Sequence, residues 1–293
     1  MKFGEVTEID LSGVDFTLPA DHAATSTLLG KQTPVKPKVY VGCAKWGRKD
    51  WIGKVYPEGT KEEDFLKLYA QHFNSIELNA TFYRFPTISQ TSGWASEVGD
   101  GFKFSPKFTD KISHLKRLKD VKELTDVFLK GISGFKEKLG PVFIMPHPAM
   151  GLKSIDRFET FISLLPSDLQ LFIELRHAQW YAEPEAFEKI FSMFERSNVG
   201  SIITDAAGRR DCVHMRLTTP VAFIRFVGNN LHPSDYTRVD AWIQRIKSWM
   251  EGGLQELYFF MHQTEEIHSP TLCKYVIEQL NEKCGTDLHI PSF

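Results

Sequence analysis

The stretch SIELNATFYRFP, residues 75–86, decides the fold. It begins as an apolar β-strand, places Glu77 and Asn79 two residues apart, and runs into the aromatic turn Phe82-Tyr83-Arg84-Phe85. Glu is rarely buried without a partner, so a carboxylate at the end of a core-like strand needs neighbours from elsewhere in the chain. Strands of a parallel sheet bring such side chains together, because their carboxyl ends meet at one face.

The same pattern, a short apolar or β-branched run ending in polar residues, recurs along the chain. It predicts eight strands: VYVGCA (39–44), NSIELN (74–79), GFKFSPK (101–107), PVFIM (141–145), QLFIEL (170–175), NVGSIIT (198–204), VAFIRF (221–226) and ELYFFMH (256–262). Segments with helical periodicity lie between them. They are residues 61–73, 120–139, 154–165 with Ser154 as the predicted cap, 183–197, 235–250 and 269–283, with a weaker helix at 205–217.

Apolar runs that alternate with amphipathic helices indicate a parallel sheet buried on both faces. Eight such units predict an α/β fold of the (β/α)8 TIM-barrel type, with a doubly wound open sheet as the alternative. No GxGxxG or GxxxxGK motif follows a strand, which disfavours a nucleotide-binding open sheet. We expect residues 1–37, small, polar and proline-containing, to be an N-terminal extension or arm, and residues 38–293 to be a single barrel domain.

Composition limits the function classes. Of the 293 residues, 42% are hydrophobic and 25% charged, and the net charge of −2 disfavours a globally basic nucleic-acid binder. A local basic patch such as TDKISHLKRLKD (109–120) stays open, although such runs are usually solvated faces. The four scattered cysteines, an N-terminus without a signal-peptide pattern and the lack of a long apolar run predict a soluble cytoplasmic protein with reduced thiols and no membrane partner.

Polar residues end almost every predicted strand. We predict Glu77, Glu174 and Asp205 as catalytic acids or bases, and Lys107, Arg176 and Arg225 as an anion site for a small anionic ligand. The other predicted ligand-binding residues are Trp46, Asn79, Tyr83, His114, Trp180 and His262. Two alternatives remain: the charged residues close the barrel as a salt-bridge network, and Asp205 caps the next helix. Glu77, Glu174, Asp205 and His262 could also hold a divalent metal, but no HxH or HExxH spacing supports it, so neither metal nor cofactor is assigned.

The motifs GCAKW, LYAQHFNSIELNATFYRFP, KFSPKFTDKISH, KLGPVFIMPHP, IELRHAQW and AFIRFVG occur in this order and resemble the domain of unknown function 72 family from about Val39 to Leu280. The resemblance implies a (β/α)8 barrel and supplies no reaction. Matching motif positions mark Trp46, Trp51, Tyr56, Glu77, Asn79, Phe82, Tyr83, Lys107, His114, Glu174, Arg176, Trp180, Asp205 and Arg225.

The chain departs from the family pattern at several strand ends. They read Cys43-Ala44-Lys45, Met145-Pro146-His147-Pro148, Val227 where His is usual, and His262-Gln263 where paired Asn is usual. These changes indicate a divergent member with a different ligand or lost activity. Three hypotheses follow: an enzyme for an anionic or phosphorylated small molecule, a nucleic-acid-binding or repair-type metal-dependent barrel, and a non-catalytic ligand-binding or scaffold barrel. The sequence does not show whether the protein is catalytic or what its oligomeric state is.

Overall fold

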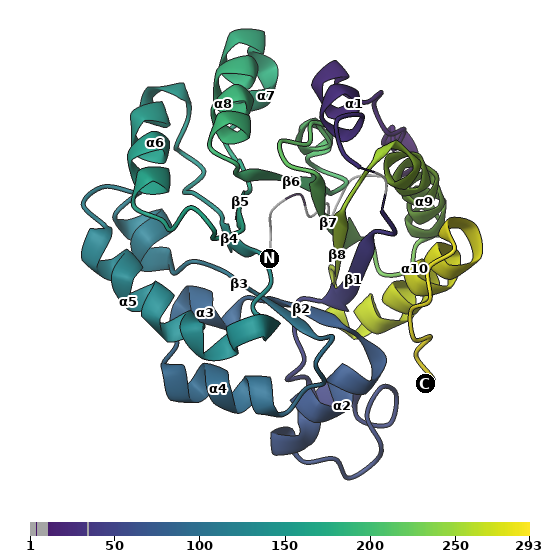
Figure 1. Ribbon diagram of the computed structural model, residues 1–293. Helices are drawn as coiled ribbons and strands as arrows, with labels where there is room; N and C mark the ends of the chain where they lie inside the picture. The colour runs from purple at the N-terminus through teal and green to yellow at the C-terminus, as the bar shows by residue number, and fades with distance from the viewer. Residues whose placement is uncertain (1–3, 5–10, 34) are drawn as a thin grey trace.

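The computed structural model describes residues 4, 11–33 and 35–293 (Figure 1). Residues 1–3, 5–10 and 34 of the predicted N-terminal extension lie outside the described residues. Each of the eight predicted apolar runs forms a strand, so these predictions are confirmed. The strands are β1 (Lys38–Cys43), β2 (Ser75–Leu78), β3 (Lys103–Pro106), β4 (Val142–Ile144), β5 (Leu171–Ile173), β6 (Gly200–Asp205), β7 (Val221–Gly228) and β8 (Glu256–Gln263).

Every strand pairing is parallel. Six strands form one sheet in the order β1-β8-β7-β6-β5-β4, and β2 pairs with β3 in a second sheet. Isolated bridges from Phe104 to Leu139 and from Lys107 to Phe143 lie between β3 and the β4 region. On the other side, the Asn74 side chain accepts from Val41 N and donates to Val39 O, both at 2.8 Å. The hydrogen bonds thus establish an α/β fold with a parallel six-stranded sheet and a parallel strand pair.

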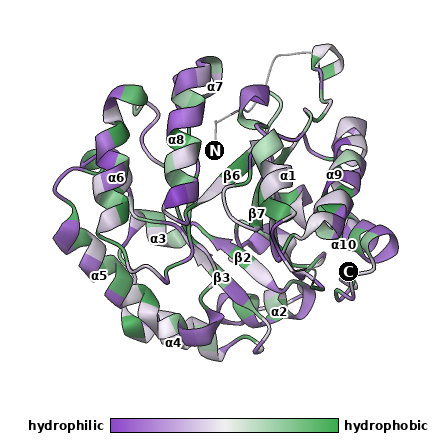
Figure 2. Ribbon diagram, turned by 45° about the horizontal axis from the view of Figure 1, so that its top comes forward, coloured by the Kyte–Doolittle hydropathy of each residue, from purple (hydrophilic) through white to green (hydrophobic). Residues whose placement is uncertain are grey.

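Helices surround the strands (Figure 1). They are α1 (Ala23–Leu29), α2 (Phe65–His72), α3 (Ala80–Tyr83), α4 (Ile88–Ser96), α5 (Lys122–Ile132), α6 (Ile155–Ser163), α7 (Gln179–Ala182), α8 (Pro184–Arg196), α9 (Pro233–Gly252) and α10 (Ser269–Cys284). Both hydrophobic and hydrophilic residues lie along them (Figure 2). In α8, for example, Ala186, Ile190, Phe191 and Phe194 are buried at helical spacing, so hydrophobic burial explains the predicted periodicity.

The six stronger helix predictions are confirmed, except that the one at 120–139 is an α-helix only as far as Ile132 and continues as the 3-10 segment Ser133–Lys138. Two further details are wrong. Ser154 occupies the N-cap position of α6 without a side-chain cap hydrogen bond. Its ψ of 5° is that of a turn, because the 3-10 turn Leu152–Ser154 leads directly into the helix, whereas a capping residue is usually extended. Residues 205–217 do not form the predicted weaker helix and contain only the short 3-10 turn Arg210–Cys212.

The N-terminal helix α1 lies between α8 and α9 (Figure 1), over the connection from β6 to β7 that lacks a helix. Thr25 Oγ1 donates to Met215 O and accepts from Leu217 N, each at 2.9 Å. His22 Nε2 lies 2.9 Å from Glu188 Oε1 on α8. The segment around α1 is therefore packed against the α/β core, and the N-terminal extension or arm with its boundary at residue 37 stays a prediction.

We expect Thr25→Val to lower the free energy of unfolding by roughly 1–3 kcal/mol, because it leaves two buried backbone groups without their partner. Thr27 is the matched control, since its hydroxyl bonds only to Ala23 O at an exposed site in the same helix. Urea unfolding of Thr25→Val and Thr27→Val would measure the difference, and equal stabilities would show that α1 contributes little.

The strands bury an inner aromatic cluster made of Phe143, Phe172, Ile202, Val221, Phe223, Tyr258 and Phe260. Side chains two residues apart on a strand share a face, so the residues two positions further on continue this inner face toward the carboxyl ends. Those positions carry polar or thioether groups: Met145, Glu174, Thr204, Arg225 and His262. A polar layer therefore lies directly above the inner aromatic cluster.

Candidate functional site

Arg225 forms the centre of the buried polar layer. Its Nε and Nη2 donate to the two carboxylate oxygens of Glu77 at 2.8 Å each, and its Nη1 donates to Glu174 at 2.5 Å. Glu174 also pairs with Arg176 at 2.7 Å and accepts from Thr204 Oγ1 at 2.8 Å. The planar guanidinium suits this two-oxygen contact. The structure therefore contains the salt-bridge network that the sequence left open as an alternative.

Both carboxylates of this network remain ionised. Burial by itself raises the pKa of Glu77 and of Glu174, but the Arg225 guanidinium beside both, with Arg176 beside Glu174, outweighs it. The pKa of Glu174 lies below its ordinary value, and that of Glu77 lies well below it. Removing one partner of such a buried pair would leave an uncompensated charge, which is strongly destabilising.

His262 extends the network toward α10. Its Nε2 lies 3.0 Å from Glu77 Oε2, and its Nδ1 lies 3.5 Å from Glu266 Oε1. Burial lowers the pKa of His262, yet the carboxylates of Glu77 and Glu266 outweigh that effect, so the pKa is raised. The imidazole thus lies between two carboxylates, which favour its protonated form, and its Nε2 also lies 3.2 Å from Arg225 Nη2.

Lys107 lies at the carboxyl end of β3, in the same polar layer as this network. Its side-chain nitrogen, however, has different neighbours from the nitrogens of Arg225 and Arg176. Its side chain is 4% exposed, and its Nζ lies 3.8 Å from Met145 Sδ and 4.4 Å from the centroid of the Phe82 ring. Within the described part of the chain, no carboxylate lies at ion-pair distance from this nitrogen. Burial, followed by the nearby Arg225 charge, lowers the pKa of Lys107 to about 7.

A cavity of about 790 Å³ opens above Lys107 and His262. Its other lining residues are Ala44, Lys45, Arg48, Asp50, Asn79, Phe82, Tyr83, His114, Met145, Gln263, Thr264, Glu265, Glu266 and Ile267. A second cavity of about 330 Å³ shares Ala44, Lys45, Asn79 and Tyr83 with it and is also lined by Trp46 and Glu77. The volume of the larger cavity is in the range of small-molecule sites. The buried side chains of Lys107 and His262 lie at its floor.

Several predicted ligand-binding residues meet at these two cavities: Trp46, Asn79, Tyr83, Lys107, His114 and His262. Tyr83 is 77% exposed and lies at the opening. Burial, with His147 and Lys107 nearby, lowers the pKa of His114 to about 4, so its imidazole is neutral. Asn79 Nδ2 donates to Glu77 Oε1 at 2.8 Å, which links the cavity wall to the ion network.

Other predicted residues lie elsewhere. Glu174, Arg176 and Arg225 belong to the ion network beneath the cavity and are not among its lining residues. Trp180 is fully buried: its Nε1 donates to Met150 O at 2.8 Å and its ring packs on Phe158. The structure thus places Trp180 in the core between α6 and α7, away from the cavity.

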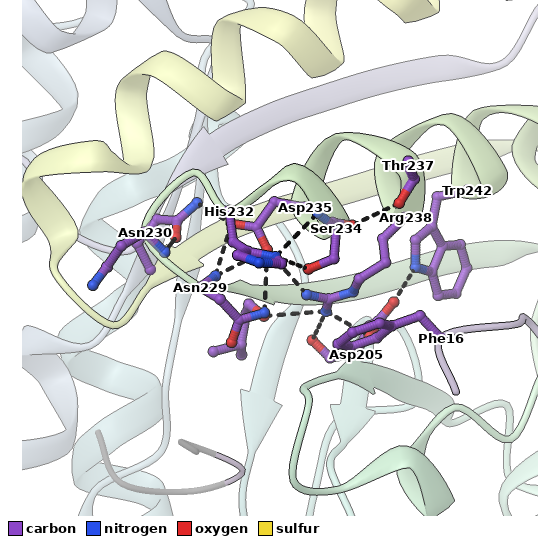
Figure 3. A network of polar contacts seen from close by, with 12 residues as sticks. Phe16, Asp205, Asn229, Asn230, His232, Ser234, Asp235, Thr237, Arg238 and Trp242 are labelled. Carbon is purple, nitrogen blue, oxygen red and sulfur yellow. Dashed lines mark hydrogen bonds and ion pairs between the residues drawn. The ribbon is translucent and has the colours of Figure 1, made fainter. Parts of the chain in front are cut away.

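Asp205, predicted as catalytic, lies in a second buried network (Figure 3). Its Oδ1 accepts from Arg238 Nη2 and its Oδ2 from Trp242 Nε1, each at 2.6 Å, and Arg210 pairs with it as well. Burial raises the pKa of Asp205, but the two guanidinium groups outweigh it and the pKa is lowered. The alternative that Asp205 caps a following helix is wrong, because the following segment contains only the short 3-10 turn.

This second network ties the loop after β7 to the cavity wall (Figure 3). Arg238 Nη1 lies 3.3 Å from Asp235, and Asp235 accepts from Asn229 N at 2.7 Å. Asn230 N donates to Gln263 Oε1 at 2.6 Å, and Gln263 lines the cavity. Through these bonds the network holds the end of β8 in place and contributes to the site by positioning.

The four residues considered for a metal do not converge, because Asp205 lies in the second network. Among the residues that the structure describes, no group of three or more His, Cys, Asp or Glu side chains could hold a metal ion.

None of the helices in the described part of the chain is long and apolar enough to span a membrane.

Sequence reasoning missed Arg48 and Glu266 as cavity residues. Arg48 lies in the loop after β1 and pairs with Asp50 through Nε at 2.8 Å. Glu266 follows His262 by four residues and also accepts from Ser269 Oγ at 2.6 Å. The His-x-x-x-Glu spacing after β8 was the available signal, whereas nothing in the sequence marks Arg48 as a cavity residue.

Parallel strands with a charged layer at their carboxyl ends and a cavity above it define an α/β protein, a fold class in which ligands are generally bound at that edge. Within this class, the chain belongs to the family described as "Protein of unknown function DUF72", whose model matches residues 40–291. The resemblance inferred from the motifs is thereby confirmed. The match begins after α1, so the segment that covers the β6–β7 connection lies outside it.

Relatives and solved structures agree with this assignment. The chain is 25% identical over 262 residues to the UPF0759 protein YecE of Escherichia coli (strain K12), covering 83% of this chain and 93% of that protein. It is 24% identical to the UPF0759 protein YunF of Bacillus subtilis (strain 168), over 50% of this chain and 53% of that one. A DUF72 family structure from Thermotoga maritima shares the fold with a TM-score of 0.67 at 20% identity, covering 83% and 99% of the two chains. One from Enterococcus faecalis gives 0.65 at 17%, covering 87% and 98%.

Proposed function

We propose that the chain is an enzyme acting on a small anionic molecule, such as a phosphorylated or carboxylate metabolite, bound in the 790 Å³ cavity. The observation that carries the proposal is Lys107, a buried amine at the cavity floor without a carboxylate partner among the described residues. Buried cationic side chains are normally paired, so an anionic ligand would complete the contacts of this one.

The charge balance of the site supports this reading. Glu77 and Glu174 contribute two carboxylates, and Arg225 and Arg176 contribute two matching guanidinium groups. The network is balanced without Lys107. Its positive charge is therefore available to a ligand, and Lys45 adds an exposed ammonium group at the opening of the same cavity.

We also propose that the two sheets form one closed (β/α)8 barrel, with residues 38–293 as its single domain and residues 1–37 as an extension whose α1 packs on it. Support comes from the parallel pairing of all eight strands, the bridges on the β3 side and the Asn74 bonds on the β1 side. The cavity then lies at the carboxyl face of the barrel, where enzymes of this architecture carry their sites.

The proposal predicts that glycerol 3-phosphate binds at pH 6.5 and glycerol does not. Lys107→Met should weaken binding about tenfold or more, because it removes the cation at the cavity floor. Binding should also weaken as the pH rises above 7, since Lys107, whose pKa is lowered to about 7, then loses its proton. Isothermal titration calorimetry would measure both effects.

Lys103→Met is the matched control. Lys103 lies at the opposite end of β3, where its Nζ donates to Glu137 O at 2.5 Å, so this variant should bind like the wild type. If no phosphate or carboxylate compound binds, or if Lys107→Met binds equally well, the proposed function is wrong. A scaffold role would then account for the charged layer. Salt-dependent binding of a single-stranded oligonucleotide would favour the nucleic-acid hypothesis instead.

A further inference from the structure

We infer that Lys107 is a covalent nucleophile, whose amine forms an iminium with the carbonyl carbon of an anionic aldehyde or ketone bound in the cavity. This inference rests on the proposed function and narrows its substrate class to carbonyl compounds. It follows from the position of the amine, the groups around it and the behaviour expected of such an amine.

The backbone of Lys107 is fixed on several sides. Its N–H lies 3.2 Å from Leu78 O and 3.0 Å from Thr81 Oγ1, and its carbonyl accepts from Thr81 Oγ1 at 2.7 Å. A parallel bridge joins it to Phe143 in β4. The side chain therefore starts from a rigid point in the strand layer and brings its nitrogen to the cavity floor.

The surroundings of the nitrogen suit a neutral amine. The Nζ faces the Phe82 ring at 4.4 Å, the Phe143 ring at 5.8 Å and the Met145 sulfur at 3.8 Å. A thioether and aromatic rings stabilise an ammonium far less than a carboxylate would. The burial that lowers the pKa of Lys107 to about 7 leaves a substantial neutral fraction near neutral pH. A desolvated lysine of this kind is the usual form of an activated amine nucleophile.

Lys138 shows that burial alone does not give this arrangement. It is 8% exposed, but its Nζ donates to Ala95 O at 2.9 Å and to Val98 O at 2.7 Å. Two carbonyl oxygens thus accept hydrogen bonds from this nitrogen, and the Asp100 carboxylate lies 3.8 Å from it. Among these two buried lysines, only Lys107 faces a cavity that a substrate can enter.

The covalent step balances in atoms and charge. The nitrogen lone pair of Lys107 forms a bond to the carbonyl carbon while the π pair moves to oxygen, and a proton shifts from nitrogen to that oxygen to give a carbinolamine. Uptake of one further proton lets the hydroxyl leave as water, so the C–O bond breaks and a C=N⁺ bond forms. His262, which lines the same cavity and whose pKa is raised, can supply that proton from its imidazolium form.

The iminium keeps a positive charge on the same nitrogen. The attraction for an anionic substituent on the substrate therefore persists through the covalent step, so the electrostatic role of Lys107 and its nucleophilic role are compatible. An iminium withdraws electrons from the adjacent carbon, which would favour proton abstraction or C–C bond cleavage there. Neither reaction needs an oxidant, a metal or a second substrate.

The test compares two pairs of compounds that differ only in the carbonyl: dihydroxyacetone phosphate with glycerol 3-phosphate, and pyruvate with lactate. Full-length protein is incubated with each compound and with sodium cyanoborohydride, and adducts are located by intact mass and peptide mapping. We expect one adduct per chain, on Lys107, from a carbonyl compound and none from its alcohol partner. The alcohol partner should compete and reduce the labelling at least severalfold.

Lys107→Arg should remove the adduct, and Lys103→Arg should keep it. Mapping on the wild type keeps the test valid if the Lys107 variant folds poorly. Binding of the alcohol and carbonyl partners without an adduct, or labelling spread over exposed lysines, would overturn the inference and leave the proposed function standing. Failure of all four compounds to bind would overturn both.

Discussion

Lys107→Met is expected to raise the free energy of unfolding by roughly 2–5 kcal/mol at pH 6, even though it should weaken binding of the proposed ligand. Burial, then the Arg225 charge, lowers the pKa of Lys107 to about 7 in the folded chain. The unfolded chain holds the same proton with an ordinary lysine pKa. At pH 6 Lys107 is protonated in both the folded and the unfolded chain. Folding of the wild type therefore carries the full cost of burying an ammonium group, whereas a methionine of similar shape at this position carries no such cost.

The sign of the pH dependence follows from the lowered pKa. Between about pH 7 and pH 10.5 the unfolded chain binds more protons at this lysine than the folded chain, so its contribution to wild-type stability rises with pH in that range. The advantage of Lys107→Met should shrink by roughly 3 kcal/mol between pH 6 and pH 9.5. Urea unfolding at several pH values would measure it, with Lys103→Met as a control that shows no such trend.

A Lys107→Met variant less stable than the wild type at pH 6 would mean that the ammonium group is well paired in the folded chain. The anion site and the nucleophile would then both lose their basis. The expected result has the opposite meaning: a residue that lowers stability at the floor of a cavity is consistent with the role proposed for Lys107, because stability and function often conflict in proteins.

The sequence revealed the strands because their inner faces must be apolar. It also revealed the polar layer, because alternation along a strand places Glu77, Lys107, Glu174 and Arg225 two residues beyond inner positions. What it could not reveal was the pairing. Glu77 and Arg225 are 148 residues apart, and only the folded arrangement of the strands decides that Arg225, and not Lys107, takes the Glu77 carboxylate. Among the described residues, no carboxylate lies at ion-pair distance from Lys107. The proposed function depends on this consequence of the Glu77–Arg225 pairing.

Errors arose where tertiary packing overrode local pattern. Residues 205–217 have helix-compatible composition, but α1 lies over this segment and Thr25 takes up hydrogen-bonding groups of Met215 and Leu217. Asp205 ends a strand like the other predicted acids, yet Arg238, thirty-three residues later on α9, binds its carboxylate. Such partners are distant in sequence. A position at or after the end of a strand therefore could not show that Asp205 and Trp180 lie away from the cavity.

Glu77→Gln is expected to lower the free energy of unfolding by about 3–5 kcal/mol, since it leaves buried Arg225 and His262 with an excess of positive charge. The amide keeps the shape of the carboxylate but presents an N–H₂ group to the Arg225 fork. Glu62→Gln is the matched control, because Glu62 pairs with Lys49 at 2.6 Å on the surface, where both side chains are about 70% exposed. That change should cost less than about 1 kcal/mol.

A double variant separates the Glu77–Arg225 pair from the rest of the network. Arg225→Met alone leaves Glu77 with His262 and Asn79, and Glu174 with Arg176 and Thr204, so it too should destabilise strongly. Combined with Glu77→Gln it removes both charges, and the loss should fall short of the sum of the single variants by about 2 kcal/mol or more. Additive losses, or a Glu77→Gln variant as stable as Glu62→Gln, would show that the pair is not ionised. The charge balance that leaves Lys107 to the ligand would then not hold.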